Sequence, residues 1–439
     1  MSSPEEREAE LLGDIELGTN EPDRNEVVVA GVTLKASGQG GSDRNNYANL
    51  DLLRSLAVLS VVATHFWQQS NAVHLWNFSD GTRRLFFEVS LNLSFTGVMF
   101  FFVHTCLVLM LSMHRAPDAH RWRNFLIRRA FRIYPLCWAT ILLVLATGLT
   151  DQPEGWLHTL GWRGIVANFL LVQNMLHRGL NTSVIAPLWS LPWEVQMYLL
   201  LPFFFNLFRR FDRFCVALGV WLGATVLMEV VALKSIPLHT YLHGTFYIPM
   251  FVGGMVAYRA LVCEPAKQYR GILPAAIWPF FILSLFALQC CLMGRSELRS
   301  AFGGGVDACI CLLLGLAIPV FAQLKAKWIV IPTQQIAKYS YGIYLLHMPV
   351  LVFVLHYLSG LPLALMALVF LSLTALLSYA SFNLIEDPLI RLGKRLTQTG
   401  QKTRKPDFTR TAELSFVRAT AATEQGGAQL GRQPGETTI

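Results

Sequence analysis

The chain carries few charged residues for its length. Asp, Glu, Lys and Arg make up 15% of its 439 residues, whereas a typical water-soluble domain carries about 25%. Hydrophobic residues make up 53% of the sequence, and the mean hydropathy is +0.43. This balance excludes a soluble globular domain of ordinary composition and indicates a membrane protein.

The sequence also lacks the short motifs of several function classes. Its eight cysteines form no Cys-x-x-Cys pair, so we expect them to be small core hydrophobes rather than disulfides or metal ligands. No dinucleotide fingerprint, P-loop or His-Glu-x-x-His motif occurs. We therefore expect no metal site, no bound cofactor and no nucleic-acid partner, and we attribute the formal charge of +8 to membrane topology.

Both ends of the chain are polar. Residues 1–48 lack the basic-then-apolar pattern of a secretory signal, and we expect a disordered cytoplasmic tail there. Residues 396–439 are expected to form a second disordered cytoplasmic tail. One membrane domain, residues 49–395, lies between them.

Ten apolar runs in this domain approach the roughly 20 residues that a helix needs to cross a bilayer. They predict an all-α, polytopic membrane bundle with about ten transmembrane helices. A shorter run from Gly164 is expected to be a re-entrant or interfacial helix. The ten runs are 50–68, 91–112, 132–149, 187–207, 214–233, 244–261, 273–293, 303–323, 336–356 and 363–385.

Basic residues gather in the loops on one side of this arrangement. The loops 113–131, 208–213, 262–272 and 324–335 share that side and contain more Lys and Arg than the opposite loops. Because cytoplasmic loops carry the excess of Lys and Arg, both termini are predicted to be cytoplasmic.

The first apolar run carries an arginine and a histidine on one helical face. Arg54 and His65 are eleven residues apart, which is about three turns and a rise of about 16 Å. Arg54 lies where it can reach the membrane surface, and His65 lies near mid-membrane. Ionisable groups at that depth are rare and usually face a cavity, although a hydrogen-bonded packing histidine is the alternative.

Other ionisable residues are expected at a similar depth. Glu194 follows the entry of its run from the outside, His347 lies about eleven residues into its run, and His104 is central in its own. Side chains of this kind on several helices predict a polar cavity within the membrane.

A basic cluster precedes the third run. Arg128, Arg129 and Arg132 stand in the sequence RRAFRIYP, and Arg129 and Arg132 share a helix face. Arginine forks suit phosphate groups, but ordinary anchoring on the cytoplasmic side is the alternative. Pro135 is expected to kink the start of the run or to fix its entry.

These motifs, in this order, resemble those of the acyltransferase 3 family of integral-membrane acyltransferases, from about Tyr47 to Arg395. One departure is that His104-Thr105-Cys106-Leu107 stands where the family usually has Leu-Ser-Gly-Phe, which affects acceptor identity or close packing. The matching segments are LDLLRSLAVLSVVATHF with its Arg-x10-His, GVMFFFV, RRAFRIYP, LWSLPWEVQMYLLLP, YSYGIYLLHMPV and IEDPL.

The resemblance implies transfer of an acyl group, most often acetyl, from cytoplasmic acetyl-CoA as co-substrate to a hydroxyl of a carbohydrate or lipid-linked sugar, as in polysaccharide modification. It also implies a bacterial inner membrane location. On this basis His65 is the expected general base, with Glu194 orienting it or binding acceptor hydroxyls. The implied roles are catalytic for His65, Arg54 and Glu194, acyl-CoA-binding for Arg129, Arg132 and Arg128, substrate-binding for Trp189, Ser190, Tyr198, Tyr344 and His347, and supporting for Asp51 and Glu386.

One other function class stays open from the residues alone. Ten helices with a carboxylate and a histidine at mid-membrane also suit a proton-coupled transporter or exporter of a small polar solute. No inverted repeat is evident in the hydropathy, and the arginine cluster lies where a phosphorylated soluble donor would bind.

Overall fold

The structure is a computed structural model that describes residues 26–29, 32–35, 47–72, 80–115, 121–153, 155–175, 183–211, 213–233, 247–262, 269–293 and 296–398. Most of the two predicted tails lies outside these residues. Within the first predicted tail, β1 (Glu26–Val29) and β2 (Val32–Lys35) form an antiparallel hairpin, with Glu26 opposite Lys35.

The described membrane domain is helical, and the ten predicted runs correspond in order to ten of its helices. The all-α prediction is confirmed. The helices are α2 (Ala48–Ala72), α3 (Asp80–His114), α4 (Arg121–Thr147), α5 (Trp156–Leu170), α6 (Leu191–Arg210), α7 (Phe214–Leu233), α9 (Ile248–Val262), α10 (Ile277–Met293), α11 (Ser296–Ala317), α12 (Lys327–Tyr357), α13 (Leu363–Ser381) and α14 (Asp387–Gln398).

Six spans among the described residues are long and apolar enough to cross a membrane, and α9, α10 and α11 are shorter apolar helices. Their side chains agree with a lipid environment: α7, for example, exposes Leu222, Val226 and Leu227. The chain is therefore an integral membrane protein. The six spans are Ala48–Ser70, Phe86–His114, Arg121–Thr147, Phe214–Val231, Lys327–Tyr357 and Leu363–Gln398.

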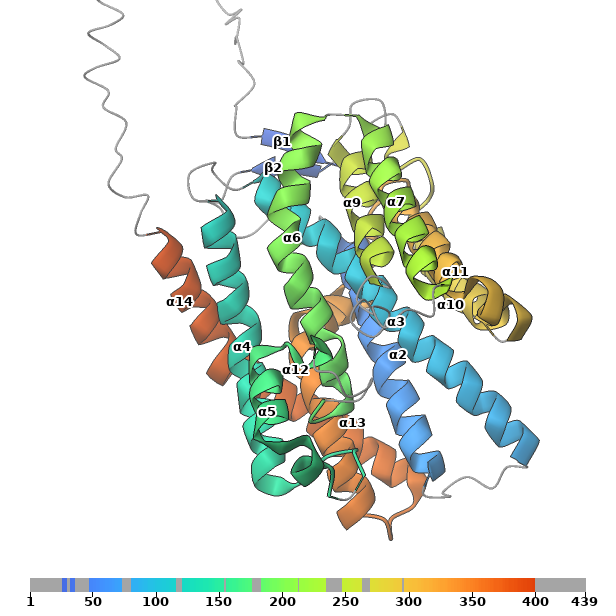
Figure 1. Ribbon diagram of the computed structural model, residues 1–439, viewed down its shortest axis with the longest axis vertical. Helices are drawn as coiled ribbons and strands as arrows, with labels where there is room; N and C mark the ends of the chain where they lie inside the picture. Colours follow the sequence, from blue (N-terminus) through green and yellow to red (C-terminus); the bar gives the residue numbers. More distant parts are fainter. Residues whose placement is uncertain are drawn as a thin grey trace, which may run out of the picture.

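The long helix α3 lies at the centre of the bundle. It packs against α2 on one side and against α9, α10 and α11 on another, while α12 packs between α2 and α13 (Figure 1). We call the end at which α2 and α4 begin and α3, α6 and α9 end the basic end, because Arg115, Arg121, Arg209 and Arg259 lie there.

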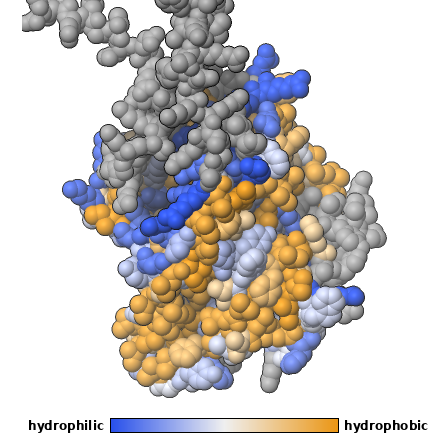
Figure 2. Space-filling view, turned by 90° about the vertical axis from the view of Figure 1, so that its left-hand side faces the viewer, coloured by the Kyte–Doolittle hydropathy of each residue, from blue (hydrophilic) through white to orange (hydrophobic). Residues whose placement is uncertain are grey.

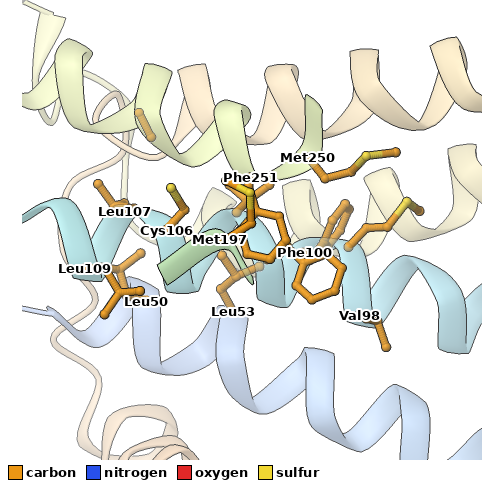
Figure 3. Close-up of a cluster of buried hydrophobic side chains, with 14 of the residues drawn as sticks. Leu50, Leu53, Val98, Phe100, Cys106, Leu107, Leu109, Met197, Met250 and Phe251 are labelled. Carbon is orange, nitrogen blue, oxygen red and sulfur yellow. The ribbon is translucent and has the colours of Figure 1, made fainter. Parts of the chain in front are cut away.

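Large apolar side chains fill the contact between α2, α3, α6 and α9. Leu53, Phe100 and Phe251 are almost fully buried there (Figure 3). Gly254 of α9 lets that helix approach α3 closely, because a Cβ at this position would collide with the backbone of Val103 and lie 2.8 Å from the Cβ of Cys106. Gly254 thus allows close packing of α9 against α3 beside Cys106.

Helix α4 begins earlier than its predicted run. It starts at Arg121 rather than at residue 132 and continues through Pro135 to Thr147, so Pro135 does not mark the start of this helix. The arginines of the RRAFRIYP segment therefore stand inside a continuous helix, on a surface that faces the bundle and α14.

The short run from Gly164 forms α5, a helix of 15 residues with a non-helical backbone at Gly161. At 1.5 Å per residue it is too short to cross about 30 Å of hydrocarbon. It packs beside α4, where Trp138 donates from Nε1 to the carbonyl oxygen of Phe169 at 2.8 Å.

The last helices bend at a π-helical turn, η6 (Phe382–Glu386), which separates α13 from α14. The helix α14 packs along α4 and continues to Gln398, beyond the predicted domain boundary at residue 395. Figure 2 shows an apolar surface over the lower part of the face formed around α4 and α5, with hydrophilic side chains gathered above it.

Candidate active site

A cavity lies between α2, α3, α4, α6 and α12. Gly97 and Phe101 of α3 form part of its apolar wall. Polar and charged side chains line this cavity together with apolar ones, as the sequence predicted for a polar cavity in the membrane domain. The polar and charged lining residues are Arg54, Arg132, Ser190, Glu194, Tyr198, Ser340, Tyr341 and Tyr344.

Gly97, in the GVMFFFV segment, allows α2 and α3 to approach each other beside the cavity. A Cβ at this position would collide with the side chain of Ser60 and lie 2.7 Å from the carbonyl oxygen of Ala57. Real Cβ atoms do not come this close to a backbone oxygen, so the local separation of the two helices depends on glycine.

Arg54 connects α2 to α12 at one end of the cavity. Its Nε donates to the Oγ of Ser340 at 2.6 Å, and its guanidinium lies 5.4 Å from the centre of the Phe101 ring. It interacts electrostatically with Arg132 and Glu194. The hydrogen bond and the ring fix the direction of a cation whose remaining donors are available to an anion.

Arg129 and Arg132 add two further guanidinium groups on α4. The guanidinium of Arg129 lies 5.8 Å from the centre of the Phe125 ring, and its buried Nε has no hydrogen-bond partner within the described chain. Glu386, buried in η6, interacts electrostatically with Arg132 and Arg54, and its Oε1 also has no hydrogen-bond partner among the described residues.

These arginines are not in direct ion pairs with the carboxylates near them. Within the described chain no ion pair shorter than 4.0 Å joins Arg129 or Arg132 to Glu194 or Glu386. Partly buried cations that lack a paired carboxylate and a complete set of hydrogen bonds are costly unless an anion binds. The geometry therefore suits a phosphate-bearing ligand.

Arg128 stands apart from this cluster. Its Nε donates to the Oγ1 of Thr397 on α14 at 2.7 Å, so one of its roles is to hold α14 against α4. Asp51 lies one turn before Arg54 and interacts with it electrostatically, in the position expected of a supporting residue.

His65 is hydrogen-bonded to His347, which the sequence analysis assigned to substrate contacts. The Nδ1 of His65 lies 2.8 Å from the Nε2 of His347, and the two rings are within 5° of parallel. The Nδ1 of His347 lies 3.0 Å from the carbonyl oxygen of Ile343. The structure thus places a second histidine, not Glu194, next to His65.

The order of donors in this chain follows from neutral imidazole chemistry. A carbonyl oxygen only accepts, so the Nδ1 of His347 carries the proton that it donates to Ile343. The Nε2 of His347 is then the acceptor, and the Nδ1 of His65 is the donor. A neutral imidazole carries one N–H, so the Nε2 of His65 keeps a free lone pair.

This histidine pair stands about one turn beyond the cavity lining. Val61, one turn before His65, lines the cavity, and so does Tyr344, whose ring centre is 6.2 Å from that of His347. Eleven residues of α2 separate Arg54 from His65, a rise of about 16 Å. The cavity therefore connects the arginine cluster with the neighbourhood of the histidine pair.

Hydroxyl groups also line the cavity. The Oγ of Ser190 and the phenolic oxygen of Tyr344 are 2.7 Å apart. Tyr198 donates its hydroxyl to the Oε1 of Glu194, one turn earlier on α6, and both side chains are buried. Glu194 is thus held by Tyr198 and acts electrostatically on Arg54, Arg132 and Arg129 rather than on His65.

Trp189 does not line the cavity. Its ring stacks on that of Phe95, with centres 6.3 Å apart, and lies 5.5 Å from the ring of Tyr247. The segment that carries Trp189 and Ser190 is held from behind by Asp151, whose Oδ1 accepts from the backbone N–H of Ala186 at 3.0 Å. Burial raises the pKa of Asp151 above its usual 3.8.

Ser340, which was not predicted from the sequence, lines the cavity, and His104, which was expected at cavity depth, interacts with its arginines. Ser340, Tyr344 and His347 follow at positions i, i+4 and i+7 of α12, a spacing that marks one helix face. His104 is buried, acts electrostatically with Arg54 and Arg132, and has an Nδ1 without a hydrogen-bond partner within the described chain.

Comparison with known proteins gives one family match. A family model described as an acyltransferase domain, that of the acyltransferase 3 family, matches residues 47–382. These residues include the cavity, the arginine cluster and the histidine pair. No curated protein matches the chain, and no solved structure matches it.

Proposed function

We propose that the chain moves an acetyl group from acetyl-CoA to a hydroxyl of a carbohydrate or lipid-linked sugar. The chain belongs to the acyltransferase 3 family and is therefore a membrane acyltransferase. The observation that carries this proposal is the bond between His65 and His347 beside a cavity that also holds Arg54 and Arg132. A base and a set of phosphate-binding groups are thus joined by one internal space.

The arginines would bind the phosphate groups of the donor. Arg129 and Arg132, with Arg54 directed by Ser340, offer guanidinium donors that no carboxylate of the described chain occupies. Glu386 and Asp51 moderate the repulsion between the cations, and Arg128 supports the cluster through α14. The pantetheine arm would then extend along α2 toward His65, over a rise of about 16 Å.

His65 would act as the general base. Its Nε2 lone pair removes the proton from the acceptor hydroxyl while that oxygen attacks the thioester carbonyl carbon. The tetrahedral intermediate collapses as the carbon–sulfur bond breaks, and the proton held by His65 passes to the leaving thiolate. The products are the acetyl ester and free CoA, and His65 returns to its neutral form.

His347 would position this base by fixing its tautomer and ring orientation. The hydroxyls of Tyr344 and Ser190 lie on the cavity side of the pair. When Ser190 donates to Tyr344 rather than to the carbonyl oxygen of Pro187, the phenolic proton can stabilise the developing oxyanion. Glu194 and Tyr198 are then the groups that contact hydroxyls of the acceptor, and Trp189 supports the segment that carries Ser190.

The orientation in the membrane follows from the charge distribution. Because arginines gather at the basic end, the positive-inside rule would put that end, and both termini, in the cytoplasm. Soluble acetyl-CoA would then reach the arginine cluster directly. The acceptor is expected to be a surface carbohydrate or its lipid-linked precursor in a bacterial inner membrane.

Acetyl transfer is tested in membranes that contain the wild type or the His65→Ala variant. Acetyl-CoA labelled in the acetyl group is added, and free thiol and labelled lipid or glycan are measured. The wild type is expected to yield both products, and the variant neither above background. If the folded wild type releases no thiol from several acyl-CoA donors with hydroxyl acceptors present, the donor assignment is wrong and a proton-coupled transporter becomes the better account.

A further inference from the structure

His104 is a buried imidazole of α3 that the proposed mechanism does not use. Its side chain is 4% exposed, and its Nδ1 has no hydrogen-bond partner within the described chain. Buried polar atoms are normally hydrogen-bonded, and an ionisable side chain at membrane depth usually has a function. The motif that this segment resembles usually has leucine at this position, so an apolar side chain would fill the same space without the cost of an unpaired nitrogen.

The spacing along α3 puts His104 on the cavity side of that helix. Gly97 and Phe101 both line the cavity, and His104 follows them at i+7 and i+3, which is the same helix face. Cys106 lies on another face, among the apolar side chains between α3 and α9 (Figure 3). His104 therefore belongs to the wall of the cavity rather than to the contact with α9.

The ring of Phe101 contacts both His104 and Arg54. The guanidinium of Arg54 lies 5.4 Å from the centre of this ring, and the centre of the His104 ring lies 6.2 Å from it, with the two planes at 25°. The charged groups that act on His104 in the described chain are Arg54 and Arg132, both of which line the cavity. One imidazole and two guanidinium groups thus lie close together at this wall.

These three side chains have donors for one another but few acceptors. A guanidinium has no acceptor atom, so neither arginine can accept an N–H of His104, whereas an imidazole offers at least one N–H in either protonation state. Donors from three helices that converge in this way suit an anion with several oxygens. Phosphate has this chemistry, and arginine pairs with it in a fixed geometry.

The position of His104 along the bundle agrees with the order of groups in the donor. Because α3 runs toward the basic end, His104 lies about 4.5 Å nearer that end than Phe101 does. Arg54 is separated from His65 by a rise of about 16 Å along α2. With the thioester at His65, the diphosphate at the other end of the pantetheine arm would lie beside Arg54 and Arg132, next to His104.

We infer that His104 is a further donor-binding residue, which donates an N–H to a diphosphate oxygen of acetyl-CoA between Arg54 and Arg132. The inference rests on the proposed function and adds a group that the resemblance does not supply. It also gives the buried nitrogen of His104 a partner when the donor is bound.

A lipid-linked sugar also carries phosphate, and its chemistry is the same. The two sources differ in what they predict for CoA and for pantetheine, which lacks the diphosphate. If His104 binds the donor, its loss weakens the binding of CoA but not that of pantetheine. If it binds a phosphate of the acceptor, its loss leaves the binding of both unchanged.

The experiment measures the Kd for CoA and for pantetheine by calorimetry, on purified protein without acceptor. The variant His104→Phe keeps a ring beside Phe101 without an N–H, and His104→Asn keeps an N–H near the position of Nδ1. Because a hydrogen bond to a charged group is strong, the Kd for CoA is expected to rise about 10-fold or more in His104→Phe and to stay near the wild-type value in His104→Asn. The Kd for pantetheine should not change in either variant. His356→Phe, at an exposed position of α12, is the control and should match the wild type.

Equal Kd values for CoA in the wild type and in folded His104→Phe would overturn the inference while leaving acetyl transfer intact. An equal rise of the Kd for CoA and for pantetheine would also contradict it, because the change would then act on the shape of the cavity and not on the diphosphate. Failure of the folded wild type to bind CoA would contradict the proposed function itself. If His104→Phe does not fold, His104→Leu replaces it, since leucine is the usual residue of the related motif.

Discussion

The Nδ1 of His65 and the Nε2 of His347 lie 2.8 Å apart, in rings that are nearly parallel. Because His347 donates from its other nitrogen to the carbonyl oxygen of Ile343, the pair leaves the lone pair of His65 on Nε2. A backbone carbonyl thus sets, through two imidazoles, which nitrogen of His65 accepts a proton. On the proposed function, the second histidine would perform the orienting role that a carboxylate performs in many hydrolases.

Substitution of His347 tests this relationship. His347→Ala removes the acceptor of the His65 N–H, so the base loses its fixed tautomer and ring orientation. We expect kcat to fall by about 10- to 100-fold, less than the 10²- to 10⁴-fold typical of losing the base itself, with little change in the KM for acetyl-CoA. His356→Ala, an exposed histidine on the same helix, is the control. A kcat equal to that of the control would show that His347 does not position His65.

Substitution of Ser340 tests the positioning of Arg54. Ser340→Ala removes the 2.6 Å hydrogen bond to Nε, and a hydrogen bond to a charged group contributes about 1.5–3 kcal/mol. We expect the KM for acetyl-CoA to rise by about 10-fold. Ser284→Ala, which removes an exposed hydroxyl of α10, should leave the KM unchanged. The same KM in both variants would mean that the bond does not matter for donor binding.

Substitution of Gly97 tests the close approach of α2 and α3. Gly97→Ala would place a methyl group 2.7 Å from the carbonyl oxygen of Ala57, and overpacking of this kind costs about 1–3 kcal/mol. Gly219→Ala on α7 is the control, because open space surrounds that position and alanine favours a helix by up to about 1 kcal/mol. Thermal unfolding in detergent should therefore show opposite shifts of Tm. A stable Gly97→Ala variant would contradict the packing account.

Asp151 supports a prediction about stability and pH. Its folded pKa is raised by burial, so its favourable contribution is present below the unfolded value of about 3.8 and is lost as the pH rises through the folded pKa. Ionisation of this carboxyl in the folded protein is therefore a cost that its hydrogen bond from Ala186 offsets in part. Asp151→Asn keeps an acceptor without the charge, and its Tm should equal or exceed that of the wild type.

The matched variant Asp151→Ala leaves the N–H of Ala186 without its acceptor. Loss of one partner of a buried hydrogen bond costs about 1–3 kcal/mol, so this variant should unfold at a lower temperature than Asp151→Asn. Equal Tm values for the two variants at neutral pH would show that the bond does not hold the segment before α6.

Hydropathy predicted the fold well because ten of the described helices are separate apolar runs. Ten runs gave ten helices in the right order, but their ends were less accurate. The start of α4 was missed because its first turns are basic and read as a loop, whereas packing against α14 keeps them helical. The bend at Phe382–Glu386 was missed because a π-turn leaves no clear mark on the hydropathy.

The sequence predicted which site residues share a face of the same helix, but it did not predict which residues of different helices contact each other. The spacing of Arg54 and His65 placed both on one face of α2, and His347 was placed at a similar depth. That His347, rather than Glu194, would contact His65 depends on how α2 and α12 pack against each other, which neither run encodes by itself. Ser340 could have been found from its shared face with Tyr344 and His347.

The central claim is that His65 is the base for acyl transfer from acetyl-CoA, and the direct test is the rate of thiol release with acceptor present. The wild type, His65→Ala and the control His356→Ala are compared at saturating acetyl-CoA. The account predicts that kcat of His65→Ala falls by about 10²- to 10⁴-fold with the KM for acetyl-CoA nearly unchanged, while the control matches the wild type. A folded His65→Ala protein that transfers acetyl groups at the wild-type rate would contradict it.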